Sequence, residues 1–525
     1  MRKWIVCLAA AGALLAGSRE TYAQNAQVTG AVKDQTGGAV PGVTVTARNQ
    51  ETGLTRTAVS DEAGNYRLPA LPPGYYVVTT QLQGFGSETR PDIVLVIDQT
   101  ATIDFTLKPA GKAETITVMG ESPIVDATSS TVSTSVSYEQ IQDLPVASRR
   151  WIDLAMLTPG TSQDNIRGFF YRGNVNIGAG AREYSNGVLV DGVNNTWAEM
   201  GEPRQNFAMD SIREFKVSTS NYKSEYGLAT GGLLTVVSKS GTNEFHGSAF
   251  TFFRDKSLNT KTVFETERPP FRRYQYGGSL GGPIVKDKTH FFLAYEGTKE
   301  NQFFTVNTRG IWPQYDGTFK SQQDRWTYMA KVDHQINHSQ SLMVRWAAED
   351  EYRPIITAGG GTTGRAVHPT NSFDFAVPRR SAVLGHTWVM NERSINEFRF
   401  QYAFAKYEVA PPYSHGDWAA GDFGQDRLSF CTPIFTYPSI AIGGCGNSQM
   451  GPETRWQAKD DFSYLVADWH GQHQLKTGAD FSYITFQFDN MQSPLGSWTF
   501  PKDAPFNASD PTTFPTQYTN SLPSY

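Results

Sequence analysis

Alternation of apolar and polar residues is the strongest pattern in the second half of the chain. In its clearest example, every second residue from Phe398 to Phe404 is aromatic, whereas Arg399 and Gln401 between them are polar. Successive side chains of a β-strand point to opposite faces, so this spacing predicts a strand with one aromatic and one polar face. Similar patterns predict strands near residues 244–254, 272–284, 289–300, 325–336, 341–350, 381–390, 394–408, 455–467 and 473–488.

The connections between these predicted strands alternate in length. Every second one is tight, at residues 285–288, 337–340, 391–393 and 468–472. The others are long, at residues 255–271, 301–324, 351–380 and 409–454. Short periplasmic turns and long extracellular loops are typical of outer-membrane β-barrels, and aromatic outward faces suit a lipid environment. Residues 243–525 are therefore expected to be part of an antiparallel transmembrane β-barrel.

The region from residue 24 to residue 110 predicts a small β-sandwich. Val28–Val32 and Val43–Ala47 alternate, and they are separated by a turn rich in Gly and Pro at residues 37–42. Further turns at residues 61–66 and 71–74 precede the strand from Tyr75 to Gln81. Several short strands at this spacing, with Gly and Pro between them, indicate a sandwich of two sheets.

The region from residue 111 to residue 242 predicts a mixed α/β domain of short elements. It begins after a linker at residues 108–111, and a helix-like segment from Tyr138 is stopped by Pro145. Between the two lies a β-branched, extended stretch made of Glu114, Thr115, Ile116, Thr117 and Val118.

The first 23 residues predict a signal peptide, so the protein is expected to be exported. Two basic residues precede the apolar run from Trp4 to Ala16, and small residues approach Ala23. Once residues 1–23 are removed, the remaining cysteines are Cys431 and Cys445. Two cysteines this close in an exported chain predict a disulfide that closes a loop, rather than a redox or metal pair.

Composition agrees with a barrel and argues against other classes of protein. Aromatic residues make up 13% of the chain, although the mean hydropathy is −0.41. A barrel reconciles these values because only every second residue of a strand faces lipid. The net charge of −5 is spread without a basic block, which argues against nucleic acid as a partner.

Motifs for catalysis or metal binding lack the necessary context. Residues 277–281 match the Gly-x-Ser-x-Gly pattern of a hydrolase, but a strand and a tight turn follow instead of a helix. His334 and His338 are four residues apart but straddle a strand end and a turn. We therefore expect no enzymatic activity, no catalytic residue, no cofactor and no metal site.

A series of motifs resembles the TonB-dependent outer-membrane receptors, in particular their Oar-like branch. The motifs are Glu121–Asp126, Gln142–Pro145, Leu157–Gly160, Val190–Val193 and Val237–Gly247. The sandwich resembles the carboxypeptidase-regulatory-like domain, a transthyretin-like fold that precedes the plug in that branch. Its matching segments are Gly30–Asp34, Ala39–Val43, Asp61–Tyr66 and Leu71–Tyr76.

The resemblance implies a mainly β protein with an N-terminal transthyretin-like or Ig-like sandwich, a small α/β plug and a large antiparallel barrel. In this family a plug fills a barrel of about 22 strands. Nine predicted strands would therefore make this sequence part of a longer protein. The outer membrane is the expected location, with the N-terminal domain in the periplasm.

The resemblance also implies an importer that is energised from the inner membrane. A TonB-like protein would pull on the TonB box, for which the stretch from Glu114 to Val118 is the candidate. The alternative is that this stretch is the last strand of the sandwich or the first strand of the plug. Substrate contacts are expected in the plug segment Phe169, Phe170, Tyr171 and Arg172 and in the extracellular loops.

The substrate class and two other functions remain open at this point. An oligosaccharide or a peptide is slightly favoured as the substrate because the sequence carries no metal-chelate signature. A non-transporting outer-membrane receptor or adhesin is one alternative. A secreted, β-rich carbohydrate-binding protein is the other.

Overall fold

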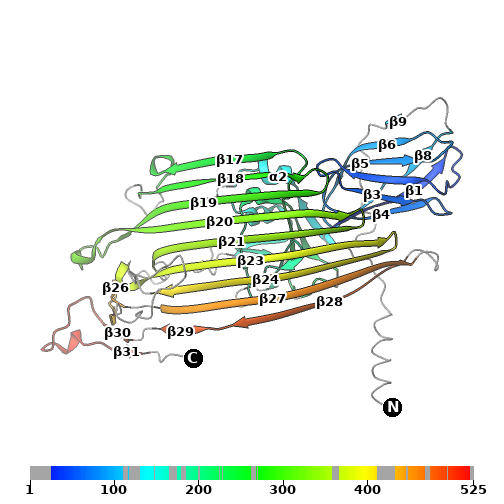
Figure 1. Ribbon diagram of the computed structural model, residues 1–525. Coiled ribbons are helices and arrows are strands. Elements are labelled where there is room, and N and C mark those ends of the chain that lie inside the picture. The colour runs from blue at the N-terminus through cyan, green and yellow to red at the C-terminus, as the bar shows by residue number, and fades with distance from the viewer. Residues whose placement is uncertain are drawn as a thin grey trace, which may run out of the picture.

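A computed structural model describes most of the chain. The described residues are 25–109, 116–117, 131–146, 148–164, 174–178, 185–198, 201–223, 225–227, 229–261, 268, 270–357, 366–410, 432–444, 447–466, 473–492 and 495–520. They form a sandwich, a plug, a long antiparallel sheet and a small sheet built from loops (Figure 1).

The N-terminal region is the predicted β-sandwich. One sheet has the order β4-β1-β7, with β8 also paired to β1, and the other has the order β3-β2-β5-β6-β9. Inward positions such as Val28, Val45, Leu68 and Val78 are fully buried between the sheets. The strands are β1 (Ala26–Asp34), β2 (Thr44–Asn49), β3 (Thr55–Val59), β4 (Asn65–Leu71), β5 (Gly74–Gln81), β6 (Glu88–Leu95), β7 (Thr100–Thr102), β8 (Phe105–Leu107) and β9 (Ile116–Thr117).

Residues 131–238 form the second unit, which we call the plug. Its main sheet has the order β10-β15-β16-β13-β14, and a hairpin of β11 and β12 lies beside it. Ser137 caps the one α-helix of the described plug, and Pro145 follows soon after its end. The elements are β10 (Val132–Val136), α2 (Tyr138–Asp143), η1 (Trp151–Leu157), β11 (Thr161–Asp164), β12 (Asn174–Ile177), β13 (Gly187–Val190), β14 (Val193–Asn194), η3 (Met209–Ser211), β15 (Ile212–Ser220) and β16 (Leu233–Ser238).

The barrel sheet is an antiparallel meander in which each strand pairs with the next one along the chain. All nine predicted strands are present, and β29 (Asp489–Gln492) adds a further pairing to β27. The strands are β17 (His246–Asp255), β18 (Arg272–Val285), β19 (Thr289–Val306), β20 (Gly317–Asn337), β21 (Gln340–Thr357), β23 (Ser372–Asn391), β24 (Ser394–Ala410), β27 (Asn447–Val466) and β28 (His473–Phe486). The sheet is open, with β17 and β28 as the edges of the described meander.

The plug packs against one face of this barrel sheet. Its hydrophobic core continues into the wall through Phe292, Ala294, Met329 and Ala347. The opposite face carries exposed apolar side chains, including Trp346 at 48% exposure. One face of the sheet therefore meets protein, and the other has the apolar surface that lipid requires.

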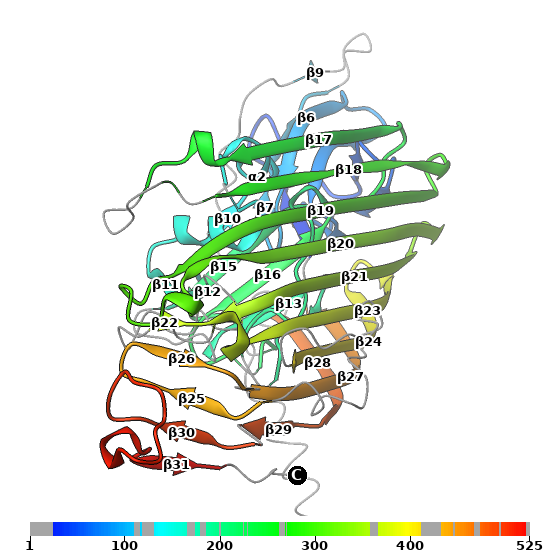
Figure 2. The ribbon, with the colours of Figure 1, turned by 90° about the vertical axis from the view of Figure 1, so that its left-hand side faces the viewer.

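The long loops at the far end of the barrel assemble into a second sheet, which we call the loop sheet (Figure 2). Its order is β22-β26-β25-β30-β31, and these strands come from three different connections. The strands of the loop sheet are β22 (Ala366–Val367), β25 (Ile434–Thr436), β26 (Ile440–Ile442), β30 (Ser497–Thr499) and β31 (Gln517–Thr519). The 3-10 helices outside the plug are η4 (Lys256–Leu258), η5 (Pro313–Tyr315), η6 (Pro369–Asn371) and η8 (Pro511–Thr513).

Several strands extend farther toward the loop sheet than the sequence predicts. β20 begins at Gly317 instead of residue 325, and β23 begins at Ser372 instead of residue 381. The first eight residues of β20, 317–324, are mostly polar on both faces, so they lack the alternation that marks a lipid-facing strand. These extensions shorten the connections that were predicted to be long.

Candidate functional site at the plug–barrel interface

The face of the barrel sheet that meets the plug is charged. On β24, Arg399 and Gln401 are buried, whereas Phe400 and Tyr402 on the other face are half-buried. This arrangement confirms the predicted alternation. On β21 the same face carries four buried charged side chains, Arg345, Glu349, Glu351 and Arg353. The plug therefore meets a wall in which buried charges stand beside the apolar residues of the shared core.

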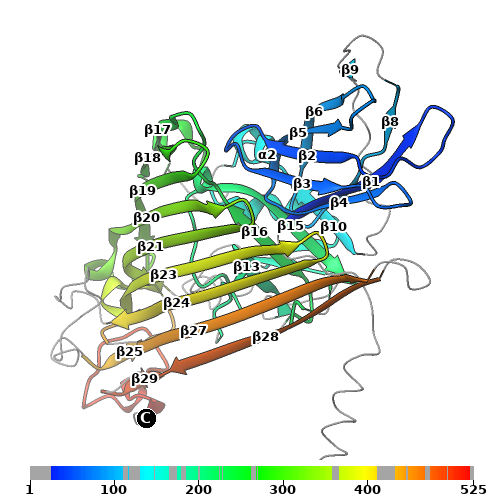
Figure 3. The same ribbon diagram turned by 45° about the vertical axis from the view of Figure 1, so that its right-hand side comes forward.

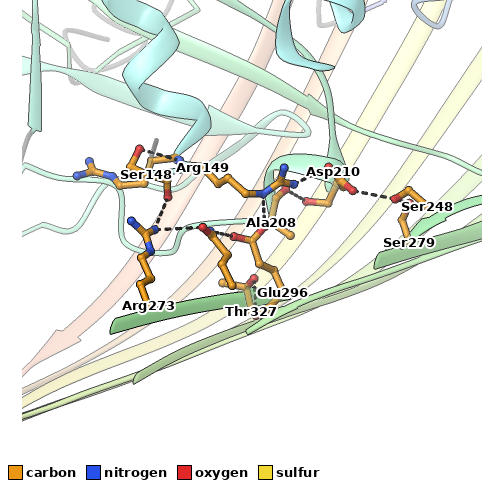
Figure 4. Close-up of polar contacts among 12 residues, drawn as sticks. Ser148, Arg149, Ala208, Asp210, Ser248, Arg273, Ser279, Glu296 and Thr327 are labelled. Atoms are coloured by element: carbon orange, nitrogen blue, oxygen red, sulfur yellow. Dashed lines mark hydrogen bonds and ion pairs between the residues drawn. The ribbon is translucent and has the colours of Figure 1, made fainter. Parts of the chain in front are cut away.

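Arg149 of the plug forms a first cluster with two carboxylates (Figure 4). One guanidinium nitrogen lies 2.7 Å from Oδ1 of Asp210, which is also on the plug. The Nε atom lies 3.5 Å from Oε2 of Glu296 on β19. The guanidinium also lies over the ring of Phe250 on β17, 3.9 Å from the ring centre. This single side chain thus links the plug to two barrel strands by charge and by a cation–π contact.

Barrel side chains extend this cluster. The Ser248 hydroxyl donates to Oδ2 of Asp210 over 2.8 Å, and Nε2 of Gln275 donates to Oε1 of Glu296 over 2.7 Å. Arg273 donates to the backbone oxygen of Ser148, next to Arg149 in sequence, over 3.3 Å. The charges are therefore embedded in hydrogen bonds from both sides, which is what buried ionic groups require.

Asp191 forms a second cluster at the turn between β13 and β14. Its carboxylate pairs with Arg345 and accepts hydrogen bonds from the backbone nitrogen of Ser238 at 2.9 Å and from its hydroxyl at 2.8 Å. Burial raises the pKa of the Asp191 carboxyl, but the charges of Arg345 and Lys331 outweigh it, so the pKa lies below its ordinary value. The Asp191 carbonyl also accepts from Nε of Arg399 over 3.1 Å. Asp191 therefore remains ionised while it holds two strands of the wall.

A third cluster lies between the middle of the plug and strands β21 and β27. Glu349 accepts from the backbone nitrogen of Asn206 over 2.8 Å and lies 3.0 Å from NH1 of Arg379. Glu453 accepts from the backbone nitrogen of Ala198 over 2.9 Å. Removing one partner from buried pairs of this kind costs about 3–5 kcal/mol, because a charge is left buried without compensation.

The sandwich docks on the short turns of the barrel (Figure 3). The Glu51 carbonyl accepts from the backbone nitrogen of Asn243 over 2.8 Å. Arg56 donates to the His338 carbonyl over 2.6 Å, and the backbone nitrogen of Val59 donates to Glu392 over 3.1 Å. The last two contacts reach the β20–β21 and β23–β24 turns. Because such turns are periplasmic in outer-membrane barrels, the sandwich lies on the periplasmic side.

The sandwich also contacts the plug directly. Glu51 forms an ion pair with Arg213 on β15, with 2.9 Å between Oε2 and NH2. The backbone nitrogen of Ile97 donates to the buried carboxyl of Glu214. Burial raises the pKa of Glu214 to about 7, and the Ile97 hydrogen bond and the charge of Arg213 only partly oppose this shift. The contact between sandwich and plug therefore contains a group that titrates near neutral pH.

The structure places only part of the residues predicted as sites. Ile116 and Thr117 form β9, which pairs in parallel with Glu88 and Thr89 at the edge of the sandwich. The rest of that stretch, Glu114, Thr115 and Val118, lies outside the described residues. The predicted substrate residues Phe169, Phe170, Tyr171 and Arg172 and the predicted disulfide residues Cys431 and Cys445 also lie outside them.

The charged clusters were not predicted, although the sequence carries a partial signal for them. Glu349, Glu351 and Arg353 stand at every second position of β21, as inward polar residues of a barrel do. The plug residue that contacts this row, Asn206 at Glu349, stands in a segment without a regular pattern. Only the folded chain shows which charges meet.

Two further searches cover the described part of the chain. Within it, no helix is long and apolar enough to cross a membrane. Across the same residues, no group of three or more His, Cys, Asp or Glu side chains is arranged to hold a metal ion.

Comparison with known proteins places this architecture in a family. Residues 237–313 and 303–524, together more than half of the chain, match the outer membrane beta barrel domain. Residues 27–108 match the carboxypeptidase regulatory-like domain. The TonB-dependent transporter Oar of Myxococcus xanthus is 31% identical over 302 residues, which is 54% of this chain and 28% of Oar. The chain thus spans under a third of the length of this curated relative.

Solved structures with a similar fold are outer-membrane proteins. The outer membrane transporter YddB from Escherichia coli has a TM-score of 0.54 at 13% identity, over 74% of this chain and 52% of YddB. The siderophore receptor PirA from Acinetobacter baumannii has a TM-score of 0.48 at 15% identity, over 69% of this chain and 49% of PirA. At such low identity, the likeness to YddB shows the fold alone. With the family match, the charged inner wall and the periplasmic sandwich, the chain belongs to the outer-membrane β-barrel domain family and is a relative of the TonB-dependent transporter Oar.

Proposed function

We propose that the protein is a TonB-dependent outer-membrane transporter, which binds an extracellular substrate and imports it with energy coupled from the inner membrane. The observation that carries this proposal is the buried ionic interface between plug and barrel wall. The similarity to Oar, a TonB-dependent transporter, supports it.

An ionic interface suits a plug that has to be displaced. When an apolar core opens, its surface meets water without compensation. Charged groups, in contrast, regain hydration when they separate, which offsets part of the lost attraction. The pairs Arg149–Glu296 and Arg345–Asp191 join the plug to the barrel, so they can hold the plug in place at rest and exchange their partners for water when the plug is displaced.

The place of β9 supports a role in energy coupling. Within the described residues, Ile116 and Thr117 pair with the sandwich edge at two positions, so few backbone hydrogen bonds retain this pair. An extended segment held this weakly can leave one sheet edge and add to the edge of another protein, where main-chain hydrogen bonds provide affinity. The partner in this proposal is a TonB-like protein anchored in the inner membrane.

The loop sheet is the proposed place of substrate capture. Trp498 and Tyr518 lie in neighbouring strands, with their ring centres 4.4 Å apart, and Tyr518 is 51% exposed. Exposed aromatic faces with a polar rim are suited to stacking on a sugar ring or a peptide side chain. Oligosaccharides and peptides are therefore the first substrate classes to screen.

Site-specific disulfide cross-linking in whole cells tests the coupling. Thr115→Cys in the full chain should cross-link to a cysteine placed in the periplasmic domain of TonB, and Ile116→Pro should abolish the cross-link by removing a backbone donor. The matched control is Thr55→Cys on β3, which should not cross-link. Uptake of the substrate found in the screen should fall in the Ile116→Pro variant.

A receptor or adhesin that does not transport is the second candidate. The shared sheet formed by loops from different connections favours it, since such a sheet can display a binding surface without any plug movement. No cross-link from position 115, together with unchanged substrate handling in Ile116→Pro, would decide for this alternative.

A further inference from the structure

A cavity of about 210 Å³ lies where the sandwich, the plug and the turns of the barrel meet. Arg56 lines it from the sandwich, Arg213 lines it from the plug, and Lys288 and His334 line it from the barrel. Water occupies about 30 Å³ per molecule in the liquid, so the space exceeds what a single water fills. Its walls belong to three separate units, and on one side it reaches Asp191 and Arg399 of the second cluster.

Arg56 is the unusual member of this lining. Its side chain is buried, with 5% of the residue exposed, and it donates one hydrogen bond to the His338 carbonyl over 2.6 Å. Its Nε atom is buried and has no hydrogen-bond partner in the structure. Burial lowers the pKa of its guanidinium, and only Tyr76 opposes the shift. Among the residues that the structure describes, no carboxylate lies within ion-pair distance of Arg56.

Two acidic residues of the cavity are already engaged elsewhere. Glu51 pairs with Arg213, with 2.9 Å between Oε2 and NH2. Asp287 accepts from Nδ2 of Asn243 over 2.7 Å, and its backbone nitrogen donates to Oδ1 of the same residue. Glu51 thus has a cationic partner and Asp287 is held by a neutral amide, and neither carboxylate lies within ion-pair distance of Arg56.

The other two acidic residues have cationic partners of their own. Asp191 pairs with Arg345, and Asp333 lies 4.0 Å from Nζ of Lys331. Lys288 lines the same cavity and has no ion pair within the described ranges. The cavity thus presents two cations, the buried Arg56 and the exposed Lys288, and neither forms an ion pair with a described carboxylate.

We propose that this cavity binds a small anion, whose carboxylate or phosphate group pairs with the guanidinium of Arg56. Water in the cavity could satisfy the free Nε donor, but it would leave the buried charge without compensation, which is costly. A planar guanidinium matches carboxylate and phosphate oxygens in geometry as well as in charge. Because three units form the walls, the bound anion also fastens the sandwich to the barrel.

Isothermal titration calorimetry on the full chain in detergent tests the site. The probes are sodium phosphate and sodium acetate, added at constant ionic strength against sodium chloride. The variant is Arg56→Met, and its matched control is Arg48→Met on the neighbouring strand β2, where the arginine is exposed. At least one probe should bind the wild type and the control, and its affinity should fall about tenfold or more in Arg56→Met.

Two further measurements distinguish a variant that fails to fold from one that folds but no longer binds the anion. A heat-modifiability gel checks that each variant retains its barrel. Lys288→Met changes an exposed barrel residue without touching the core of the sandwich, and it should weaken binding as well. Equal affinity of Arg56→Met and wild type for the bound probe would overturn the proposal. Absence of binding by both probes would also overturn it and would leave the cavity as a water-filled space.

Discussion

Glu51 of the sandwich and Arg213 of the plug lie 2.9 Å apart, and the Glu51 carbonyl also accepts from the backbone of Asn243 at the start of the barrel. One residue therefore joins all three units at the periplasmic end. The Glu51 and Arg213 side chains are 29% and 19% exposed, so their ion pair is partly screened by solvent. The backbone hydrogen bond is independent of the side chain and survives substitution of Glu51.

Arg149→Met should loosen the plug within the barrel. The substitution leaves Asp210 and Glu296 without their cation and removes the contact with Phe250. Charged hydrogen bonds of this kind contribute about 1.5–3 kcal/mol each. Urea unfolding and trypsin accessibility of the plug measure the effect.

The control for Arg149 is Arg272→Met on β18. Arg272 is 56% exposed and lies 3.6 Å from Asp255. An exposed pair of this kind is worth about 0–1 kcal/mol, so the control should behave like the wild type. Equal destabilisation by both substitutions would show that the Arg149 cluster does not hold the plug.

Contact between sandwich and plug should weaken as the pH rises from about 5 to 8. The pKa of Glu214 is raised from 4.5 to about 7, mainly by burial, so the folded state holds this proton more tightly than the unfolded state. The stabilisation is fully present below pH 4.5 and is lost as the pH rises through about 7. The measurement is the protection factor of the Ile97 amide across this pH range, that is, its hydrogen-exchange rate relative to the intrinsic rate at each pH.

Glu214→Gln isolates this group from the other titrating residues. Glutamine keeps an acceptor for the Ile97 nitrogen but carries no charge at any pH. The variant should therefore show a flatter pH profile of the Ile97 protection factor than the wild type, with protection that is retained at pH 8. Identical profiles in both proteins would rule out Glu214 as the titrating group.

Gly192→Ala should destabilise the contact between the plug turn at Asp191 and Arg399 on β24. Gly192 has a φ of +85°, and a Cβ atom placed there would lie 2.4 Å from Nε of Arg399. Gly310→Ala is the matched control, since Gly310 has a φ of +78° but nothing within 4 Å of the added carbon. Both variants should carry the backbone cost of about 1–3 kcal/mol. Only Gly192→Ala should also release the plug in a trypsin assay.

Trp312→Ala should open the loop sheet and leave the barrel intact. Trp312 is 6% exposed and packs against Tyr437 in a tilted arrangement, with 4.8 Å between ring centres, in a core shared by several loops. Loss of a buried tryptophan costs about 3–5 kcal/mol. Protease treatment of intact cells should cleave the loops of this variant faster. Ile311→Ala, at a residue that is 48% exposed, should not change the rate.

Sequence patterns predicted the barrel strands of this protein well because the alternation of apolar and polar residues is a local property. The residues from Phe398 to Phe404 show their two faces in order, and the structure places Arg399 and Gln401 against the plug as expected. On β28 the predicted alternation was poor, and Phe481 and Ile484 are both exposed there. From Thr477 to Phe486 this edge strand is exposed on both faces, so no buried face imposes an alternating pattern there.

The candidate site was much harder to predict because its contacts are distant in sequence. Arg149 meets Asp210 across 61 positions and Glu296 across 147 positions. No local periodicity encodes a pairing over such separations, and an isolated arginine in an irregular segment looks the same whether it is solvated or buried. The inward charges of β21 could have been predicted, but their partners could not.

Docking of the sandwich on the turns also sets an order of events during biogenesis. Strand pairings within the sandwich join residues 26–117, which are synthesised before the barrel strands. Its bonds to His338, Glu392 and Glu397 join residues separated by 282, 333 and 372 positions. Contacts that close such long stretches of chain form late, after the intervening strands are in place. The sandwich therefore folds before the barrel is complete. Its docking face stays exposed to periplasmic chaperones until these barrel residues are in place.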